Sequence, residues 1–256
     1  MSRVIVLDAS GQCLSTCSSD KALRLLSEGK ASLIAKTPFT IQLSYAVPPI
    51  PVPTREARLG QRVGEGKRLL LHVCCGPCGT YTIQRLREQG YAVSGFWYNP
   101  NIHPFAEHER RGLCVRSYAQ DLGLPMIWWA EYEMPAFFRA VSGREAFGER
   151  CQVCYRMRLE RTVRIARERS FDAFTTTLLI SPYQQQAVIR QIGEELAGQH
   201  GVEFHFENFR RGWSERGRMA KKHGMYQQRY CGCVYSEREA SDRKASTRLP
   251  PPPTPE

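Results

Sequence analysis

Five cysteines occupy two short stretches of the sequence with spacings that suit metal binding. Cys74, Cys75 and Cys78 form a C-C-x-x-C pattern in the stretch CCGPCG, and Cys151 and Cys154 form a C-x-x-C pattern. Thiolate sulfur is a ligand of zinc and of iron–sulfur clusters, and both kinds of site commonly use four cysteines. A C-x-x-C pattern alone could also be a redox pair. Its combination with Cys74 and Cys75 favours a metal site.

The pair Cys151 and Cys154 stands at the start of a predicted helix. Their i, i+3 spacing places both sulfurs on one side of that helix. The amino terminus of a helix stabilises thiolates through its dipole and its free N–H groups. Arg150, Arg156 and Arg158 add positive charge close by. We therefore expect thiolates to form at low cost in this stretch.

Two further cysteines, Cys231 and Cys233, form a C-x-C pattern towards the carboxyl terminus. In an extended segment this spacing places both sulfurs on one face. They could be further metal ligands, a thiol–disulfide pair or inert packing residues, and the spacing does not rank the first two. No export signal is expected, because Asp8 interrupts the first apolar stretch. The ten cysteines are therefore not expected to form a disulfide framework.

Strand and helix patterns alternate through the middle of the chain. Predicted strands cover residues 68–73, 91–101, 125–130, 172–181 and 202–209, and predicted helices cover 80–90, 107–123, 134–141, 151–170 and 184–201. Repeated βα units predict an α/β fold with a doubly wound, mostly parallel sheet, which is Rossmann-like and similar to HUP and PP-loop folds. Ligands of such sheets bind beyond the carboxyl ends of the strands. The CCGPCG stretch follows the first strand, yet it lacks the glycine and lysine pattern of a P-loop.

Polar residues follow the second and fourth predicted strands, at the same edge of the sheet. As a group they are candidates for binding a base, a sugar or a phosphate of nucleic acid. They are Tyr98, Asn99, Asn101, His103, Glu107 and Arg110 after the second strand, and Thr176, Ser181 and Tyr183 after the fourth. The competing explanations are turn formation by the Asn-Pro-Asn sequence and the strand propensity of threonine.

The chain of 256 residues carries a net charge of +11. Such a balance favours a polyanionic partner, with nucleic acid as the first candidate, although a soluble basic protein without such a partner has the same composition. The stretch 210–230 interleaves basic residues, including Arg210 and Arg211, with aromatic ones. This combination favours single-stranded RNA binding over a solvated charged face. No apolar run is long enough to cross a membrane, so we expect a cytoplasmic protein.

We expect four segments along the chain. Residues 1–47 form a small αβ module of unknown role, which resembles the leader module of some HNH-type endonucleases in its motifs VLDASG, LLSEGKA and PFTIQL. Residues 48–67 form a proline-rich linker, since dense prolines cannot join a sheet or a helix interior. Residues 68–237 form a metal-containing catalytic domain, and residues 238–256 form a disordered tail.

Five ordered motifs over residues 68–237 resemble the QueH-type epoxyqueuosine reductases: LLLHVCCGPC, YNPNIHP, RCQVCYRMRLERT, TTTLLISPYQ and YCGCVYS. The resemblance implies a tRNA-processing oxidoreductase of queuosine biosynthesis. Such an enzyme removes the epoxide oxygen of epoxyqueuosine in tRNA to give queuosine, independently of cobalamin. The resemblance also implies a [4Fe–4S] cluster with an additional iron ion beside it, and the anticodon stem-loop of tRNA as partner.

On this resemblance we assign Cys74, Cys151 and Cys154 to the cluster, and Cys75, with Cys78 as a further candidate, to the second metal. Cys231 and Cys233 would line the site as redox-active or structural thiols. The reaction needs an electron donor, which the sequence does not identify. Two alternatives stay open: a zinc-stabilised RNA-binding protein, and a tRNA sulfur-transfer enzyme on the same scaffold. The missing phosphate loop argues against the second alternative, which would need ATP.

Overall fold

The computed structural model describes residues 3–7, 9, 13–36, 39–45 and 66–246 of the chain. The chain divides into two compact units, residues 1–63 and residues 64–256, and each is described here by itself. Most of the predicted linker, residues 48–65, lies outside the described residues, as do the last ten residues of the predicted tail. None of the described helices is long and apolar enough to cross a membrane.

The first unit is a four-stranded sheet with one helix. Its elements are β1 Arg3–Leu7, β2 Cys13–Ser18, α1 Ser19–Ser27, β3 Ala31–Lys36 and β4 Phe39–Leu43, and the strand order is β2-β1-β4-β3. A small core joins the sheet to the helix through Val4, Val6, Ala22, Ile41 and Leu43. Residues 3–43 therefore combine α and β structure, as expected of a small αβ module, and its role stays a prediction.

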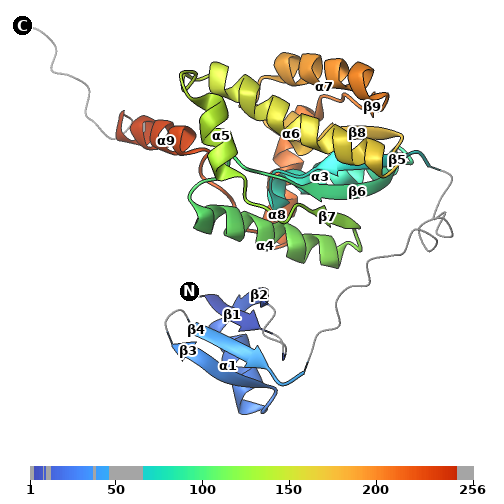
Figure 1. Cartoon of the computed structure of the whole chain (residues 1–256). Helices are drawn as coiled ribbons and strands as arrows, with labels where there is room; N and C mark the ends of the chain where they lie inside the picture. The colour runs from blue at the N-terminus through green and yellow to red at the C-terminus, as the bar shows by residue number, and fades with distance from the viewer. Residues whose placement is uncertain (1–2, 8, 10–12, 37–38, 46–65, 247–256) are drawn as a thin grey trace, which may run out of the picture. The chain divides into compact units, whose positions relative to one another are not determined.

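The second unit is built on a five-stranded parallel sheet (Figure 1). Its strands are β5 Arg68–His72, β6 Ala92–Trp97, β7 Met126–Trp128, β8 Ala173–Thr176 and β9 Glu203–Phe204, in the order β7-β6-β5-β8-β9. All four pairings between neighbouring strands are parallel. The predicted α/β fold with a parallel sheet is therefore confirmed.

Helices cover both faces of this sheet. They are α3 Gly76–Glu88, α4 Phe105–Asp121, α5 Met134–Val141, α6 Glu149–Glu168, α7 Gln186–His200, α8 Trp213–Lys222 and α9 Val234–Ser246. Helix α6 packs on β5 and β8 beside α7, whereas α3 packs on β6 beside α4 and α8. Figure 1 shows α6 and α7 above the sheet and α4 below it. The sheet is therefore doubly wound.

The central strand β5 explains why its sequence is an unbroken apolar run. It pairs with β6 on one side and β8 on the other, and its residues Leu69, Leu70 and Leu71 are fully buried. A parallel strand that is covered on both faces has no solvent side for polar residues.

Two element boundaries differ from the prediction near the sheet edge. Strand β8 ends at Thr176 and not at Ser181, because a short 3₁₀ helix, η1 Thr177–Ile180, follows it. The Thr176 hydroxyl accepts a hydrogen bond from the Leu178 N–H, a local bond that competes with strand pairing. Helix α3 begins at Gly76 and not at Thr80, because Cys75 is its N-cap and Pro77 lies in its first turn.

The predicted disordered tail is wrong for its first part. Helix α9 covers Val234–Ser246, so residues 238–246 are helical. This segment contains no glycine or proline, and the prolines of the predicted tail begin only at Pro250. Its charges also pair along the helix, as Arg238 and Asp242 do at 3.8 Å. Helix α8 likewise covers part of the basic stretch for which no helix was predicted.

Two glycines of α7 offer a matched test of its packing on β9. A Cβ atom at Gly193 would lie 2.3 Å from the Phe204 ring, whereas one at Gly198 meets nothing within 4 Å. We expect Gly193→Ala to lower the free energy of unfolding by ~1–3 kcal/mol through overpacking. Gly198→Ala should raise it by up to ~1 kcal/mol through helix propensity. Denaturant titration of both variants measures these changes, and equal effects at the two positions would contradict the packing.

Candidate metal centre

The strand order of the second unit reverses between β5 and β8. From β5 the chain proceeds outward through β6 and β7, and then returns to β8 on the other side of β5. The loop after β5 and the 3₁₀ helix after β8 therefore meet: the Cys74 N–H donates a hydrogen bond of 2.9 Å to the Thr177 hydroxyl. Ligands of open α/β sheets bind at such a reversal point.

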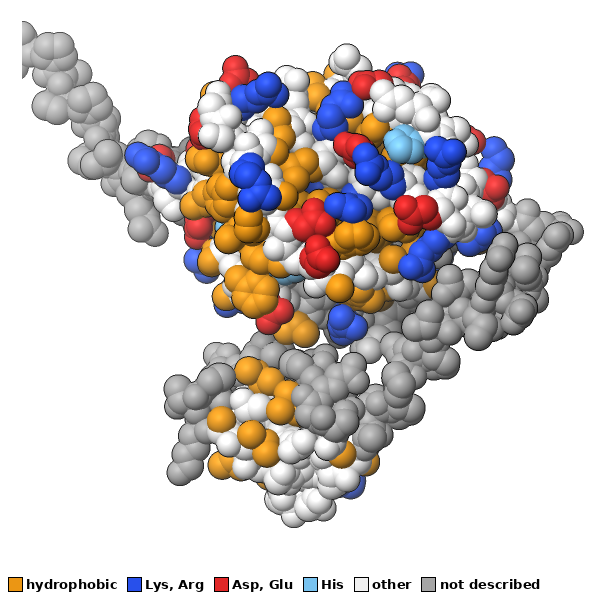
Figure 2. Space-filling view, viewed as in Figure 1, with side chains coloured by type: hydrophobic (Ala, Val, Ile, Leu, Met, Phe, Trp, Pro, Cys, Tyr) orange, Lys and Arg blue, Asp and Glu red, His pale blue; other side chains and the backbone are white. Residues whose placement is uncertain are grey.

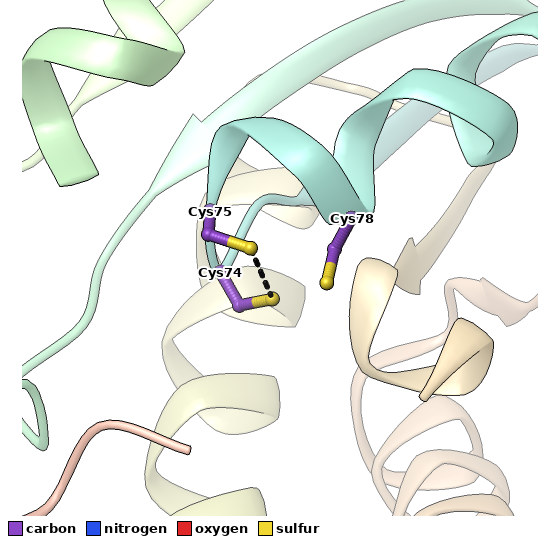
Figure 3. A group of neighbouring side chains, drawn as sticks. All are labelled: Cys74, Cys75 and Cys78. Atoms are coloured by element: carbon purple, nitrogen blue, oxygen red, sulfur yellow. Dashed lines mark hydrogen bonds between the residues drawn. The ribbon is translucent and has the colours of Figure 1, made fainter. Parts of the chain in front are cut away.

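Three cysteine sulfurs lie together at this reversal point. The Sγ atoms of Cys74, Cys75 and Cys78 are all within 4.8 Å of one another. Cys75 caps α3 and Cys78 lies in its first turn, while Cys74 precedes the helix (Figure 3). Cys75 and Cys78 are buried and Cys74 is half-buried. The group offers three soft ligands to one metal site. It includes Cys78, which the sequence analysis named only as a further candidate ligand.

Polar side chains from other parts of the chain donate to these sulfurs. The Thr177 hydroxyl donates to Cys74 Sγ at 3.2 Å, and the Gln228 amide donates to Cys75 Sγ at 3.0 Å. The hydrogen bond to Cys75 raises the pKa of the Cys74 thiol to about 12. Burial works against ionisation of Cys75, but the hydrogen bonds of Cys74 and Cys78 together with the Arg111 guanidinium hold its pKa well below the ordinary value. Of these three thiols, Cys75 is therefore the one that ionises most readily.

The other four candidate cysteines form a second group beside α6. Cys154 and Cys233 are buried in one apolar cluster that also contains Phe137 and Val141. Cys151 is half-buried and Cys231 is exposed. Within the described residues, neither Cys151 nor Cys154 joins the group of Cys74 within 4.8 Å. The assignment of both pairs to one ligand set therefore stays a prediction.

The expected ease of ionisation at the start of α6 is wrong. Burial raises the pKa of the Cys151 thiol, and burial raises that of Cys154 to about 12. The arginines do lower these values, but desolvation of the charged sulfur is the larger effect. The position at a helix terminus alone did not reveal how deeply the tertiary structure buries these side chains.

A buried ion pair on α4 anchors the segment that carries Cys231. The Arg111 guanidinium donates to the Glu107 carboxylate at 2.8 Å, to the Cys231 carbonyl at 2.8 Å and to the Tyr230 carbonyl at 3.2 Å. Glu107 also accepts a hydrogen bond of 2.7 Å from the Tyr226 hydroxyl. Sequence reasoning missed Arg111, although its i, i+4 spacing from Glu107 was visible. The predicted tRNA contact Glu107 thus holds protein segments together.

Most predicted substrate-binding residues at the second and fourth strand ends are buried. The buried set is Tyr98, Asn99, Asn101, His103, Glu107 and Thr176. Tyr98 donates its hydroxyl hydrogen to the Glu133 carboxylate at 2.8 Å. Three polar atoms of the set have no hydrogen-bond partner among the described residues: Asn99 Oδ1, Asn101 Oδ1 and His103 Nδ1. Each of these atoms can accept a hydrogen bond from a ligand, since His103 Nε2 already donates to the Pro100 carbonyl at 3.1 Å. Substrate contact by the set stays a prediction.

The remaining predicted contacts lie closer to solvent. Tyr183 is 76% exposed, and its ring meets the Trp213 ring edge-on at 6.1 Å between centroids. Arg210 donates to the carbonyls of Ser181 and Gln184, so it holds the loop that carries Tyr183. Arg211 is exposed, and Arg110 stacks on the Tyr226 ring. On the face drawn in Figure 2, basic side chains are interspersed with acidic ones and form no continuous stripe.

His72, at the end of β5, is a fully buried neutral side chain. Its Nε2 atom donates to the Tyr98 carbonyl at 3.1 Å, and its Nδ1 atom accepts from the Thr176 hydroxyl at 2.8 Å. The second role follows because a carbonyl oxygen can only accept, so the one N–H of the neutral ring is on Nε2 and Nδ1 has only its lone pair. Burial, assisted by the charge of Arg158, lowers the pKa of His72 to about 3. His72 therefore ties β5 to β6 and β8 without adding charge.

Removal of the Arg111 guanidinium should loosen the segment around Cys231 that it holds. We expect Arg111→Met to lower the free energy of unfolding by ~3–5 kcal/mol, because Glu107 loses its partner in the interior. Amide hydrogen exchange in peptides that cover residues 229–233 should also become faster. Arg116→Met, on the same helix, is the control, since the Arg116 guanidinium only stacks on Trp128. Unchanged exchange in the Arg111 variant would show that the ion pair does not hold this segment.

The neutral state of His72 predicts a stability loss in acid. The unfolded chain binds a proton at His72 near pH 6.5, whereas the folded protein does so only near pH 3. Stability from this residue is therefore complete above pH 6.5, and falls by up to ~1.4 kcal/mol per pH unit as the pH drops towards 3. Urea titrations of His72→Gln should show a shallower slope in that window. An unchanged slope in the His72 variant would contradict the assignment.

Comparison with known proteins gives a consistent result for the second unit. The family model described as epoxyqueuosine reductase QueH matches residues 69–239. An epoxyqueuosine reductase QueH of Dehalococcoides mccartyi is 40% identical over 172 residues, which is 67% of this chain and 93% of the relative. One of Thermotoga maritima is 38% identical over 185 residues, which is 69% of this chain and 94% of the relative.

The first unit matches a different family. The model described as RRXRR protein matches residues 4–66, and the resemblance to HNH-type leader modules stays a prediction. The QueH match covers the sheet, both cysteine groups and the segment of Cys231 and Cys233. Through its second unit, the chain belongs to the QueH family of epoxyqueuosine reductases.

Proposed function

We propose that this chain reduces epoxyqueuosine in tRNA to queuosine, acting in the cytoplasm on the anticodon stem-loop. The observation that carries the proposal is the group of three sulfurs within 4.8 Å, placed at the reversal point of the sheet in a member of the QueH family. The family relatives carry the name of this activity. The sulfur group supplies a site where redox chemistry can take place.

The residues present fit an iron–sulfur cofactor. Thiolates are the ligands that iron–sulfur clusters require, and two groups of cysteines stand on the same unit, with hydroxyl and amide donors aimed at their sulfurs. We assign Cys74, Cys151 and Cys154 to a [4Fe–4S] cluster. We assign Cys75, with Cys78, to an additional iron ion. Such a cofactor supplies electrons one at a time when bound.

The reaction removes one oxygen atom from the epoxide and leaves an alkene. Two electrons and two protons enter, both carbon–oxygen bonds break, and the oxygen leaves as water. The electrons come from an external donor, whose identity the chain does not specify. Cys231 is exposed and accepts a hydrogen bond of 3.3 Å from the Gln184 amide, which itself accepts from the Tyr155 hydroxyl. This chain of contacts orients the Cys231 thiol, and we assign Cys231 and Cys233 to the wall of the site.

For tRNA we assign the exposed side of the unit near Tyr183. Its ring has both the exposure and the aromatic character needed to stack on an unpaired base. Arg211, next to Arg210 in the sequence, is exposed, and the chain as a whole is basic. Arg210 contributes by holding the Ser181–Gln184 loop. The polar atoms of Asn99, Asn101 and His103 that lack partners are candidates for contact with the modified base.

Removal of Cys75 tests the reductase function. In protein purified without oxygen, Cys75→Ala should weaken binding of the additional iron ion by at least ~10-fold, because even outer contacts to metal ligands are worth that much, while the iron assigned to Cys74, Cys151 and Cys154 should stay. Conversion of epoxyqueuosine-tRNA under a strong reductant should be lost with it. Cys17→Ala, in the first unit, is the control and should keep both properties. Iron analysis and mass spectrometry of digested tRNA provide the measurements.

The same preparation separates the alternatives. Cys151→Ala should also lose iron, and full iron and activity in that variant would show that the ligand assignment is wrong. A colourless wild-type protein that contains only zinc and leaves epoxyqueuosine unchanged would overturn the reductase proposal in favour of a zinc-stabilised RNA-binding protein. Transfer of sulfur to tRNA in the presence of ATP would favour a sulfur-transfer enzyme instead.

A further inference from the structure

Arg158 is a positive charge buried between the two cysteine groups. Its side chain is 2% exposed. It lies on α6, one turn after Cys154 and two turns after Cys151, so the three side chains project from the same side of the helix. The proposed function uses the cysteines of this stretch but gives no role to Arg158.

The Arg158 guanidinium has few partners for a buried cation. Its Nε atom donates to the Cys154 carbonyl at 3.3 Å, and its buried Nη2 atom has no hydrogen-bond partner. No carboxylate pairs with it within residues 66–246. A buried charge without compensation is strongly destabilising. The folded protein tolerates this destabilisation, which indicates that a negative charge lies beside Arg158 in the functional protein.

Two other buried arginines of this unit pair with a carboxylate, whereas the buried Arg216 stacks on the Trp213 ring. Arg111 pairs with Glu107 at 2.8 Å, and Arg150 pairs with Glu239 at 2.6 Å. Arg158 differs because the groups able to carry negative charge near it are thiols. Burial opposes the charge of Arg158, but electrostatic interactions with Cys154, Cys231 and Cys74 raise its pKa above the ordinary value. Arg158 thus interacts with sulfurs of both cysteine groups.

His72 adds no competing positive charge on this side. It is neutral, because its Nε2 atom donates to the Tyr98 carbonyl and its Nδ1 atom accepts from the Thr176 hydroxyl. The Tyr155 hydroxyl, which donates to Gln184, also acts on Arg158. Arg158 is therefore a buried cation that acts on Cys74, Cys154 and Cys231 together.

We propose that Arg158 is the counter-charge of the metal–thiolate centre and raises its reduction potential. The inference rests on the proposed function, because it requires an iron–sulfur centre bound by these cysteines. Each electron that dithionite or the physiological donor delivers adds one negative charge to the centre. The guanidinium stabilises that charge and itself gains neither a proton nor an electron. Arg158 is a positioning residue, since it acts through the charge of the ligands and does not touch the substrate.

The test compares Arg158→Met, Arg158→Lys and Arg156→Met in the full chain, purified without oxygen. Arg156 is the matched control on the same helix, because it is exposed and pairs with Glu195 at the surface. Iron and sulfide contents are measured first, and the midpoint potential follows from a spectroscopic titration with dithionite. We expect Arg158→Met to lower the one-electron reduction constant at least ~10-fold, or ~59 mV. Arg158→Lys keeps the charge, so its midpoint potential should stay closer to that of wild type. The midpoint potential of Arg156→Met should equal that of wild type.

The outcomes separate this inference from the proposed function. A wild-type potential in Arg158→Met overturns the inference alone. If Arg158→Met binds no iron, the Arg158→Lys variant decides. A Lys variant that binds iron with a potential near that of wild type supports the role of the charge. Loss of iron in both variants overturns the inference, because the shape of the arginine side chain would then be the cause. A wild-type protein without iron would overturn the proposed function and the inference with it.

Discussion

The parallel pairing of β5 with β8 is the contact on which the rest of the site depends. It places His72 opposite Thr176 in register, and directly beyond it the Cys74 N–H meets the Thr177 hydroxyl. Because the chain reverses its direction across the sheet at this pair, the loop after β5 is left open at the sheet edge. In this loop, cysteine sulfurs occupy the place at which other open α/β sheets bind phosphate groups. The short 3₁₀ helix η1 follows from the same place, since Thr176 bonds Leu178 and ends the strand.

Buried charge is the second constraint on this unit. Arg111 and Arg158 approach the sulfurs from two different helices, α4 and α6. Arg111 is neutralised by Glu107 and can therefore serve as an anchor for the segment around Cys231. Arg158 has no such carboxylate in the described residues, so its charge is available to the thiolates. Arg111 thus holds the segment around Cys231 and also favours ionisation of Cys75, whereas Arg158 acts on Cys154, Cys231 and Cys74.

Residues 228–236 contact the cysteine group and the side chains that surround it. Gln228 bonds Cys75, the Cys231 carbonyl accepts from Arg111, and α9 begins at Val234, directly after Cys233. The Ser236 hydroxyl donates to the Cys233 carbonyl at 2.7 Å and so fixes the start of that helix. Residues more than 150 positions apart in the sequence, such as Cys75 and Gln228, therefore share one cluster of contacts.

The sequence by itself determined the parallel α/β fold, the family and the cysteine stretches. Apolar runs, helix periodicity and the spacings C-C-x-x-C and C-x-x-C are local properties that a single chain displays. Only the tertiary structure decided which cysteines meet, since Cys78 joins Cys74 through an early start of α3, and Cys154 packs with Cys233. It also decided the burial of Arg158, Glu107 and Thr176. Burial and long-range contacts depend on how elements pack, and desolvation then outweighs the local effects of helix dipole and neighbouring charge.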